Sequence, residues 1–407
     1  HKEGNMKSIL FLTNLLPYPG KSGGTQTTLK KLDNFIKEGF EVSFVFMKTK
    51  DTSEELFSEF ISLYSDTCHI FYEINDNNVR SVASFAKSFL EGIPLNIYRN
   101  RCASLTATVN NLIDENNFDI IFCDHLEMFQ YVPSNVYSKT IMLEHNAEYM
   151  IWRRYANQVK NPILKIGIFL ESCRMKKYEL KACKKVRFVI IAPSDKKYVS
   201  KKNEDKFIDT YHPANDFMLQ LPLPKINNDD LSLLFIGTMS WVANYQGVFW
   251  FIEKVLPHIV EKVPNAIFHV IGKFKGELPK LDNQNVILHG FVDDIEPYYK
   301  SSNIFVCPLL FGSGIKIKVL DAMYRGLPLV TTTVGAENLS LINGEHCFIE
   351  DDPKKMAEKI LELYKNKGLA MLFANNSREL AKQKYTWDEE NKKVMNMIEI
   401  IGKEHSK

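Results

Sequence analysis

The chain has 407 residues, of which 45% are hydrophobic and 25% are charged, and its formal net charge is +2. These fractions are typical of soluble globular proteins, and the length predicts two domains rather than one. A net charge so close to zero gives no reason to expect nucleic acid or another polyanion as a partner. No apolar run approaches the roughly 20 residues of a membrane-spanning helix, so no transmembrane segment is expected.

The first apolar run, "MKSILFLTNLL", superficially resembles a secretory signal. Thr13 and Asn14 interrupt it, and no small-residue cleavage site follows, so a buried strand is the better interpretation. The seven cysteines are scattered singly, without CxxC pairs and without metal-ligand spacing to histidine. This distribution predicts a reducing, cytoplasmic location and no disulfide framework.

Short apolar runs alternate with helical patterns along the first half of the chain. They lie at 9–14, 41–47, 69–74, 119–125, 140–145 and 188–193. These runs are rich in Ile, Val and Phe and show little alternation, which predicts strands buried on both faces of a parallel sheet. Between the first two, Leu29, Leu32, Phe35 and Ile36 share one face of a predicted helix, and Gly39 marks its end.

The pattern weakens at "LPLPKINNDD" (221–230), where two prolines and a polar cluster predict a linker. Further predicted strands then follow at 231–238, 266–272, 285–290, 303–309, 327–332 and 346–351. Two successive halves of alternating strands and helices predict two doubly wound α/β domains. Ligands of such folds bind at the carboxyl ends of the strands, here expected in a cleft between the domains.

A glycine pair follows the first predicted strand, in "PYPGKSGGTQTT" (17–28). Gly23 and Gly24 would let the backbone approach a ligand closely, and the free N–H groups of the following helical turn can receive an anion. Taken alone, the stretch is better explained as a flexible connection, because glycine pairs are common in loops.

The stretch "FGSGIKIKVLDAMYRGLPLVTT" (311–332) follows the predicted strand at 303–309. Gly312 and Gly314 give backbone access to a predicted helix N-terminus, where Lys316 and Lys318 add positive charge that only a bound anion would make favourable. Asp321 follows within the helix, where its carboxylate could accept hydrogen bonds from a ribose diol. This grouping favours a nucleotide site over an ordinary solvated helix face.

Two histidines end successive predicted strands, His125 in "FDIIFCDH" and His145 in "TIMLEH". A single histidine at a strand end is more often a hydrogen-bonded structural group. Two on successive strand ends make it more probable that one of them faces a ligand cleft.

A dinucleotide site is a weaker alternative for the glycine-rich stretch. "GSGIKI" supplies GxG but not GxGxxG, and it comes late in its domain instead of after the first strand. Glu337 lies at a tolerable distance for a ribose contact, but a dehydrogenase is ranked well below the nucleotide-site interpretation.

The region 160–187 carries many lysines and arginines with apolar residues between them. A basic helix facing a membrane is one interpretation. Because Glu171 and Glu179 dilute the charge, we favour a long surface helix packed on the sheet.

The whole chain, from about residue 6 to about residue 402, resembles glycosyltransferase family 4, a large group of retaining enzymes with the GT-B fold. The resemblance rests on "FDIIFCDH", "EHNAEYMIWRRYA", "LLFIGTMSWVANYQGVFWFIEKVLPHI", "VILHGFVDDIEPYYKSSNIFVCPL" and "GSGIKIKVLDAMYRGLPLVTTTVGAENL". The last stretch is the most specific and resembles the branch whose donor-site helix reads G-I-K-x-K-V-L-E-A-M. The closing "YTWDEENKKVMNMIEII" resembles the C-terminal helix of this fold.

The resemblance implies two doubly wound Rossmann-like domains that face an interdomain cleft. The first domain, on the acceptor side, would span 6–220 and be completed by a C-terminal helix at 386–402 that crosses back to it. A linker at 221–230 would join it to a nucleotide-sugar-binding domain at 231–385.

The resemblance also implies a donor site on the second domain. Asp321 matches the second acid of the family's E-x7-E motif, which holds the ribose, and Phe291 and Val292 match the loop beside the base. Gly314 and Ile315, together with the lysines that follow them, lie where backbone amides meet the diphosphate.

In the first domain, Gly24, with Gly23 before it, matches the glycine that approaches the donor phosphate. His125 matches the histidine near the transferring sugar.

Two positions depart from the family pattern. The first acid of the E-x7-E motif falls on Ser313, and Thr238 and Asn244 stand in the loop where the family has an arginine and a lysine. A diphosphate leaving group needs its developing charge stabilised. We therefore expect Lys316 and Lys318 to supply that charge and group them with His125 as catalytic residues.

The predicted function is a retaining transfer of a sugar from a nucleotide-diphosphate sugar to an acceptor hydroxyl, without a metal or other cofactor. The expected acceptor is a glycan or a lipid-linked glycan of bacterial surface polysaccharide or glycoconjugate assembly. The expected location is the cytoplasm, with a peripheral contact at the inner face of the membrane. The alternatives are a catalytically inactive relative that binds nucleotide and partners an active transferase, and a sugar-nucleotide epimerase on the same fold.

Overall fold

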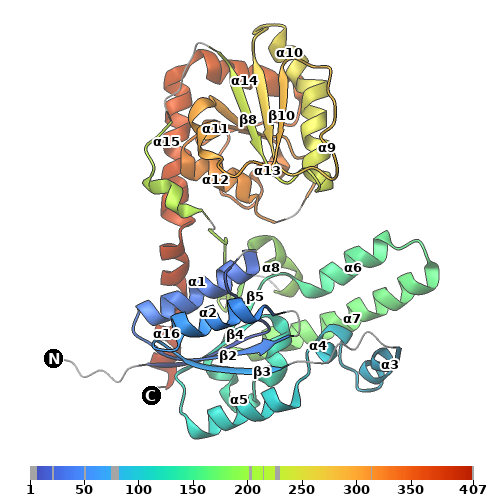
Figure 1. Ribbon diagram of the computed structural model, residues 1–407, viewed down its shortest axis with the longest axis vertical. Coiled ribbons are helices and arrows are strands. Elements are labelled where there is room, and N and C mark those ends of the chain that lie inside the picture. Colours follow the sequence, from blue (N-terminus) through green and yellow to red (C-terminus); the bar gives the residue numbers. More distant parts are fainter. Residues whose placement is uncertain are drawn as a thin grey trace, which may run out of the picture. The chain divides into compact units, whose positions relative to one another are not determined.

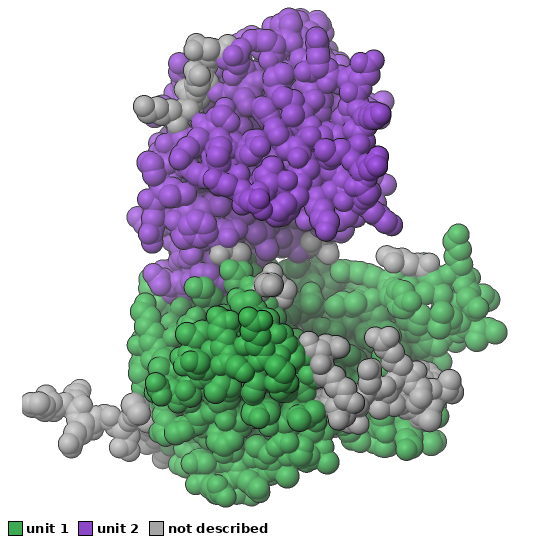
Figure 2. Space-filling model, in the orientation of Figure 1, with its two compact units in different colours: residues 1–212, 390–407 green, residues 213–389 purple. Residues whose placement is uncertain are grey.

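The computed structural model describes residues 7–20, 23–49, 52–74, 82–200, 204–213, 215–224, 230–312 and 314–405. The chain forms two compact units (Figure 2). Unit 1 comprises residues 1–212 and 390–407, and unit 2 comprises residues 213–389. Within the described ranges, every helix is too short or too polar to cross a lipid bilayer.

Unit 1 is built on one parallel sheet with the strand order β3-β2-β1-β4-β5-β6-β7. Its strands are β1 (Ser8–Thr13), β2 (Glu41–Lys48), β3 (His69–Ile74), β4 (Ile120–Asp124), β5 (Thr140–Glu144), β6 (Phe188–Ile191) and β7 (Phe207–Asp209). The order reverses direction between β1 and β4, whose registers pair Ile9 with Ile120 and Leu12 with Cys123. This pair is the topological switch point of the sheet.

Helices cover both faces of this sheet (Figure 1). They are α1 (Gly23–Lys37), α2 (Glu54–Tyr64), α3 (Val82–Leu90), α4 (Leu95–Arg99), α5 (Ala103–Glu115), α6 (Glu148–Gln158), α7 (Pro162–Lys185) and α8 (Pro193–Val199). Neighbouring residues of β1 enter different hydrophobic cores, since Phe11 packs with α1 and α2 and Leu12 packs with α5 and α7. Burial on both faces explains why these strands show little alternation in sequence.

The C-terminal helix α16 (Trp387–His405) returns to unit 1, as the fold class predicted. Its residues Val394, Met397, Ile398 and Ile401 are buried in the core on the α1 side of the sheet. Glu390, where the helix enters unit 1, is buried and accepts a 2.6 Å hydrogen bond from the Thr210 hydroxyl.

Unit 2 is built on a second parallel sheet with the order β10-β9-β8-β11-β12-β13. Its strands are β8 (Ser232–Ile236), β9 (Ile267–Ile271), β10 (Val286–Gly290), β11 (Ile304–Cys307), β12 (Leu329–Thr331) and β13 (Phe348–Ile349). The switch point lies between β8 and β11. Two doubly wound parallel sheets confirm the predicted α/β fold class.

The helices of unit 2 also divide between the two faces of its sheet. They are α9 (Val242–Trp250), α10 (Leu256–Val260), α11 (Glu296–Ser301), α12 (Ile317–Arg325), α13 (Thr333–Ala336), α14 (Pro353–Lys365) and α15 (Lys367–Lys384). Ile304 and Val306 of β11 pack into the core formed with α9, α10 and α14. Phe305 between them stacks on Tyr299 of α11 at 6.5 Å, so it faces the other side.

Two details of the chain differ from what its sequence suggested. β7 was not predicted, because three residues are too short a run for a periodic pattern. The predicted linker at 221–230 begins inside unit 2, where Arg325 and Arg378 donate to the carbonyls of Pro222 and Leu221. Residues 225–229 lie outside the described residues.

The same substitution in two helices should change stability in opposite directions. A Cβ at Gly247 in α9 would lie 2.5 Å from the carbonyl oxygen of Pro308, whereas a Cβ at Gly167 in α7 would meet nothing within 4 Å. Gly247→Ala should therefore destabilise the protein by about 1–3 kcal/mol through overpacking. Gly167→Ala should stabilise it by about 0.5–1 kcal/mol through helix propensity.

Denaturant unfolding of both variants and of the parent protein measures this difference. A stabilising effect of Gly247→Ala would show that α9 does not pack against the chain after β11 as described.

Candidate functional site

A buried carboxylate lies at the switch point of unit 1. Asp124 ends β4, and its Oδ2 accepts 2.7 Å hydrogen bonds from the hydroxyls of Thr13 in β1 and Thr28 in α1. His145, which follows β5, has its Nε2 2.7 Å from Oδ1, and His125 has its Nδ1 3.1 Å from Oδ2. We call these five residues the Asp124 cluster. It occupies the position at which open α/β sheets bind ligands.

His125 is held in an unusual backbone conformation. Its φ angle is +73°, in the left-handed region that side chains other than glycine and asparagine seldom adopt. The His125 N–H donates to the carbonyl of Leu143 at 3.0 Å, which continues the pairing of β4 with β5. Its ring stacks on His145 with centroids 4.0 Å apart, and one fifth of the side chain is exposed. Strain of this kind is common at functional sites.

The charges within the Asp124 cluster stabilise one another. Burial alone would raise the pKa of Asp124, but the two neighbouring imidazoles hold this pKa well below its usual range. Burial likewise lowers the pKa of His125, but the charge of Asp124 outweighs it and raises this pKa to about 9. His125 is therefore a cation at neutral pH, and its Nδ1 faces Asp124 as an ion pair.

A third histidine and a glycine border the Asp124 cluster. The His212 ring lies 6.1 Å from that of His145, and its Nδ1 is 2.9 Å from the Thr27 hydroxyl. Burial, with the nearby charge of His145, lowers the pKa of His212 to about 4, so this histidine is neutral at pH 7. A Cβ on Gly24 would make only an ordinary 3.6 Å contact with His145. Packing within unit 1 therefore does not itself require glycine at position 24.

Asp124, His125 and His145 are also the group of described residues with ligand atoms close enough to hold a metal ion. Their geometry favours a hydrogen-bonded cluster. The two imidazole planes differ by 23°, so their in-plane lone pairs run nearly parallel instead of converging on one point. The Asp124 carboxylate already accepts the Thr13 and Thr28 hydroxyls.

In unit 2, the carboxyl ends of β8, which borders the switch point, and of β9 beside it approach one another through glycine. Gly272 follows β9 with φ +149°, and a Cβ there would lie 1.9 Å from the carbonyl oxygen of Gly237, which follows β8. Thr238 comes next, and its carbonyl accepts a 2.8 Å hydrogen bond from the side chain of buried Asn244. The Asn244 side chain, which comes from α9, therefore holds the backbone of the loop after β8 in place.

The two predicted lysines have different surroundings. Lys316, directly before α12, is buried, donates to the carbonyl of Gly314 at 2.7 Å and lies 3.5 Å from the carboxylate of Glu337. The expectation that both lysines await an anion is thus modified, because Lys316 already has an acidic partner. Burial lowers the pKa of Lys316, and the charge of Glu337 opposes that shift.

Lys318 has no ion pair or hydrogen bond among the described residues. Its amine lies 5.4 Å from the ring centroid of Trp241 and 5.9 Å from that of Phe235. Its Cε lies 2.9 Å from where a Cβ of Gly237 would be, so the side chain reaches the loop after β8. Burial lowers the pKa of Lys318. A half-buried amine over aromatic rings is a favourable place for an added anion.

Asp321 lies one turn beyond Lys318 on α12. Both carboxylate oxygens accept hydrogen bonds of 3.1 Å from the side-chain amide of Asn215. Burial raises the pKa of Asp321 to about 7, and the Asn215 hydrogen bond and the Lys318 charge only partly oppose that shift.

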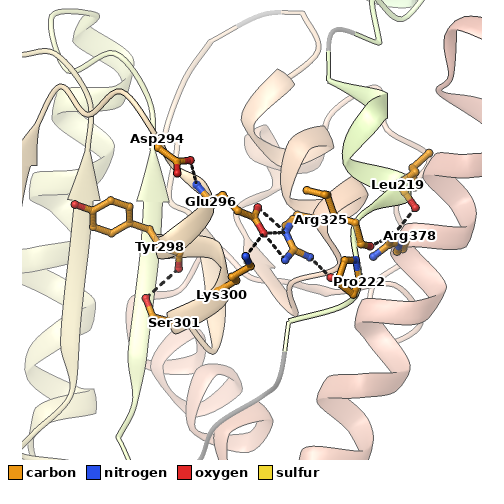
Figure 3. Close-up of polar contacts among 10 residues, drawn as sticks. Leu219, Pro222, Asp294, Glu296, Tyr298, Lys300, Ser301, Arg325 and Arg378 are labelled. Carbon is orange, nitrogen blue, oxygen red and sulfur yellow. Dashed lines mark hydrogen bonds and ion pairs between the residues drawn. The ribbon is translucent and has the colours of Figure 1, made fainter.

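Arg325 anchors the far end of α12 (Figure 3). Its buried guanidinium donates to both carboxylate oxygens of Glu296 in α11 at 2.7–3.1 Å and to the carbonyl of Pro222 at 2.6 Å. Lys300 lies 3.6 Å from the same carboxylate. Such a two-pronged pair fixes direction as well as distance, so α12 presents Lys318 and Asp321 from a fixed position.

The remaining predicted donor residues lie at separate places. Gly314, with φ +76°, and Ile315 directly precede Lys316. Phe291, whose side chain is exposed, and Val292 follow β10, and two strands separate β10 from β11. Ser313 lies outside the described residues. Gly23 and Gly24 open α1 in unit 1.

Sequence reasoning missed several residues of these groups. Asp124 directly precedes His125, and this Asp-His pair at a strand end was the available signal. Thr28, Asn215 and Trp241 gave no signal, because each joins its group only through tertiary packing. His145 was noticed as a strand-end histidine but not selected.

Part of unit 2 matches a known family. Residues 230–366 match the family model described as glycosyl transferases group 1. This segment includes Lys316, Lys318 and Asp321 of α12. It ends before α15 and does not include unit 1.

The whole chain is similar to a protein from Klebsiella pneumoniae called "Uncharacterized 44.6 kDa protein in cps region". The two are 23% identical over 418 residues, which cover 98% of this chain and 100% of the relative.

Solved structures with similar folds cover nearly the whole chain. TarM of S. aureus has a TM-score of 0.63 at 14% identity, covering 97% of this chain and 99% of its own. A glycosyltransferase from Rickettsia africae has a TM-score of 0.61 at 12% identity, covering 98% and 99%. HepE of Anabaena, in complex with UDP and glucose, has a TM-score of 0.56 at 12% identity, covering 97% and 99%. These likenesses show the two-domain GT-B fold, and with the family match they support a glycosyltransferase.

The raised pKa of Asp321 predicts how stability depends on pH. The unfolded chain ionises this group near its ordinary pKa of 3.8, whereas the folded protein keeps its proton up to about pH 7. Folding is therefore favoured by Asp321 at low pH, and this contribution is lost as the pH rises from about 4 towards 7. Asp321→Asn should match the parent at pH 4 and be more stable than the parent at pH 8.

Urea unfolding across this pH range tests the prediction. Asp293→Asn, which changes an exposed carboxylate of the same unit, is the matched control. A stability difference that does not grow with pH would show that Asp321 is charged in the folded protein throughout the range.

Proposed function

We propose that this protein is a retaining glycosyltransferase that moves a sugar from a nucleotide-diphosphate sugar to an acceptor hydroxyl. The observation that carries the proposal is the half-buried amine of Lys318 beside the glycine-lined ends of β8 and β9, within the segment that matches the glycosyltransferase family. A cation that has no acidic partner in the described part of the chain, at the switch point of a doubly wound sheet, suits a diphosphate. The likeness to HepE, solved with UDP and glucose, supports a nucleotide donor.

The proposed donor site uses unit 2. Lys318 neutralises the diphosphate, and Lys316, held by Glu337, adds charge behind it. The backbone N–H groups of Gly314 and Ile315 face the phosphates, Asp321 accepts from the ribose diol, and the loop at Phe291 and Val292 borders the base. Thr238, in the loop after β8, and Asn244 of α9, which holds that loop, lie on the opposite side of the diphosphate, and Ser313 replaces the first acid of the family motif.

The proposed role of unit 1 is to bind the sugar. His125 is a cation whose Nδ1 faces Asp124, so its Nε2 can donate a hydrogen bond to an oxygen of the transferring sugar. Gly24, whose place in unit 1 does not require glycine, leaves room for the donor phosphate, and Gly23 precedes it. His125 and the Gly23–Gly24 pair both lie at the carboxyl end of the unit 1 sheet, where ligands of such sheets bind.

In the proposed reaction, the bond between the anomeric carbon and the diphosphate oxygen breaks while the acceptor oxygen bonds to the same face of the sugar. The acceptor proton leaves with the departing phosphate. Negative charge grows on the diphosphate, and the two lysines stabilise it, so no metal ion is needed for this step.

The proposed acceptor is a glycan or lipid-linked glycan of a surface polysaccharide. The Klebsiella relative from a cps region, a polysaccharide gene cluster, supports this context. We place the reaction in the cytoplasm at the inner face of the membrane, where lipid-linked acceptors are accessible.

A second candidate is an inactive relative that binds nucleotide and partners an active transferase. The absence of the family's arginine and lysine at Thr238 and Asn244 favours it, as does Ser313.

The function is tested by product analysis with labelled nucleotide sugars and a glycan acceptor. The proposal predicts transfer with retained anomeric configuration, undiminished by EDTA. His125→Ala should lower turnover on the order of a hundredfold or more while leaving the affinity for the nucleotide diphosphate nearly unchanged. Nucleotide binding without transfer would support the inactive relative, and an epimerised donor would support the epimerase.

The two lysines should differ in calorimetry with nucleoside, nucleoside monophosphate and nucleoside diphosphate. Lys318→Gln should weaken diphosphate binding by about 1.5–3 kcal/mol, and nucleoside binding far less, because a charged hydrogen bond is lost. Lys316→Gln differs in that it should lower the stability of the unliganded protein, since Glu337 loses its partner. Equal losses across all three ligands for Lys318→Gln would exclude this lysine as the diphosphate ligand.

A further inference from the structure

The positive charge of this protein is concentrated in one helical hairpin. Residues 148–185, which form α6 and α7, contain ten lysines and arginines against three glutamates, although the net charge of the whole chain is only +2. The two helices lie side by side and lead away from the sheet of unit 1 (Figure 1). We call residues 148–185 the basic hairpin.

Two of the three glutamates of the basic hairpin face inward, and Glu148 is partly exposed. Glu179 is buried and accepts the backbone N–H groups of Glu148 and Tyr149 at 2.8 and 3.0 Å, which satisfies the start of α6. Glu171 is buried and accepts from Arg174 at 2.6 Å and from the N–H of Leu95. The expectation that these two acids dilute the surface charge is therefore wrong, because neither lies on the surface.

The first turns of α7 expose large apolar side chains. Ile163 is 82% exposed, Ile166 62% and Phe169 45%, and Leu164 and Leu170 beside them are about half exposed. The expected long surface helix does pack against unit 1, but not over its first turns. In the described part of this helix, the side chains buried against unit 1 begin at Ile168.

The exposed face continues into a groove between α7 and the end of α3. The groove has a volume of about 780 Å³. Phe89, Ile93 and Leu170 line its apolar part, and Lys177 and Lys181 line it further along α7. Glu91 also lines the groove, where its carboxylate is paired with Arg101 at 2.5 Å. Arg174 fixes the groove wall, since it stacks over Phe89 at 5.1 Å and donates to the carbonyl of Ser88 at 2.5 Å.

One face of α7 changes along the helix from apolar to basic side chains. Ile166, Leu170 and Cys173 follow one another at helical spacing and are succeeded by Lys177 and Lys181 on the same face. Among the described residues, neither lysine has an acidic partner. An apolar end followed by unpaired cations matches a molecule with an apolar tail and an anionic head.

We propose that the basic hairpin binds an anionic lipid surface. The apolar turns of α7 would enter the boundary between headgroups and acyl chains, the groove would accept a lipid chain, and Lys177 and Lys181 would contact lipid phosphates. A protein partner is less suited, because the exposed apolar side chains surround the start of the helix instead of forming one flat face. Burial of bulky apolar side chains and attraction of lysine and arginine to anionic lipids are the two contributions that hold a helix at a membrane surface.

This surface is distinct from the proposed donor and sugar groups. If the proposed function is correct, membrane attachment would bring the enzyme to a lipid-linked acceptor. Lipid binding itself needs neither donor nor acceptor, so it can be measured separately from transfer.

Co-sedimentation with vesicles of phosphatidylglycerol or phosphatidylcholine tests the proposal on the full chain without nucleotide. The protein should bind phosphatidylglycerol far better than phosphatidylcholine, and added salt should weaken binding. Lys177→Gln with Lys181→Gln should weaken binding about 25-fold, because each basic residue near an anionic surface contributes about fivefold. Ile166→Ser and Phe169→Ser should each weaken it on the order of tenfold.

Matched variants of unit 2 serve as controls. Lys354→Gln with Lys365→Gln removes two exposed lysines of α14, and Met371→Ser with Leu372→Ser removes two exposed apolar side chains of α15. These variants, and Lys318→Gln, should bind vesicles as the parent does. Lys318→Gln is included because it should impair donor binding without changing lipid binding. Its behaviour therefore distinguishes an error in the proposed donor site from an error in the proposed membrane surface.

Four results would overturn the proposal. One is the absence of binding to phosphatidylglycerol, and the second is equal, salt-independent binding to both lipids. The third is that the hairpin variants bind vesicles like the parent. The fourth is an oligomer that Phe169→Ser converts to a monomer without a change in lipid binding, which would make the hairpin an interface between copies of this chain.

Discussion

The carboxylate of Asp124 connects the parts of unit 1 on which the proposed chemistry depends. It accepts hydroxyls from β1 and α1 and pairs with imidazoles that follow β4 and β5, so one buried charge joins four elements. A buried carboxylate is costly unless it is fully paired. Here the pairing raises the pKa of His125, so the cationic ring that we propose for sugar binding is a consequence of the same contact that holds the strand ends together.

In unit 2, a close backbone contact and a buried ion pair position the residues of the proposed donor site. Close backbone contact between Gly272 and Gly237 shapes the ends of β9 and β8, and the Arg325–Glu296 pair sets the direction of α12. Within that frame, Lys318 remains without an acidic partner among the described residues, while Lys316 is balanced by Glu337. Two lysines that look equivalent in sequence thus differ in charge environment, and this difference is the reason we propose Lys318 as the diphosphate ligand.

The basic hairpin shows why charge counts along a sequence can mislead. Glu171 and Glu179 lie among its lysines in sequence, but their carboxylates face the interior, where they accept backbone N–H groups. The surface of α7 consequently carries more positive charge than a count of its basic and acidic residues suggests. The burial of individual side chains, which a residue count does not reveal, determines which charges are available to contact a membrane.

The sequence by itself predicted the α/β architecture, which the structure confirms, and the stretches that we propose as sites. Apolar runs without alternation predicted strands buried on both faces, as in β1 and β11, and the glycine-rich stretch before α12 directed attention to Lys316, Lys318 and Asp321. Local patterns suffice there because strand burial and helix starts depend on neighbouring residues. Only the tertiary structure showed that Asp124, Thr28 and His145 meet, and that Asn215 reaches Asp321. Those contacts join residues far apart in the chain, and their pKa shifts arise from burial and packing, which no local pattern encodes.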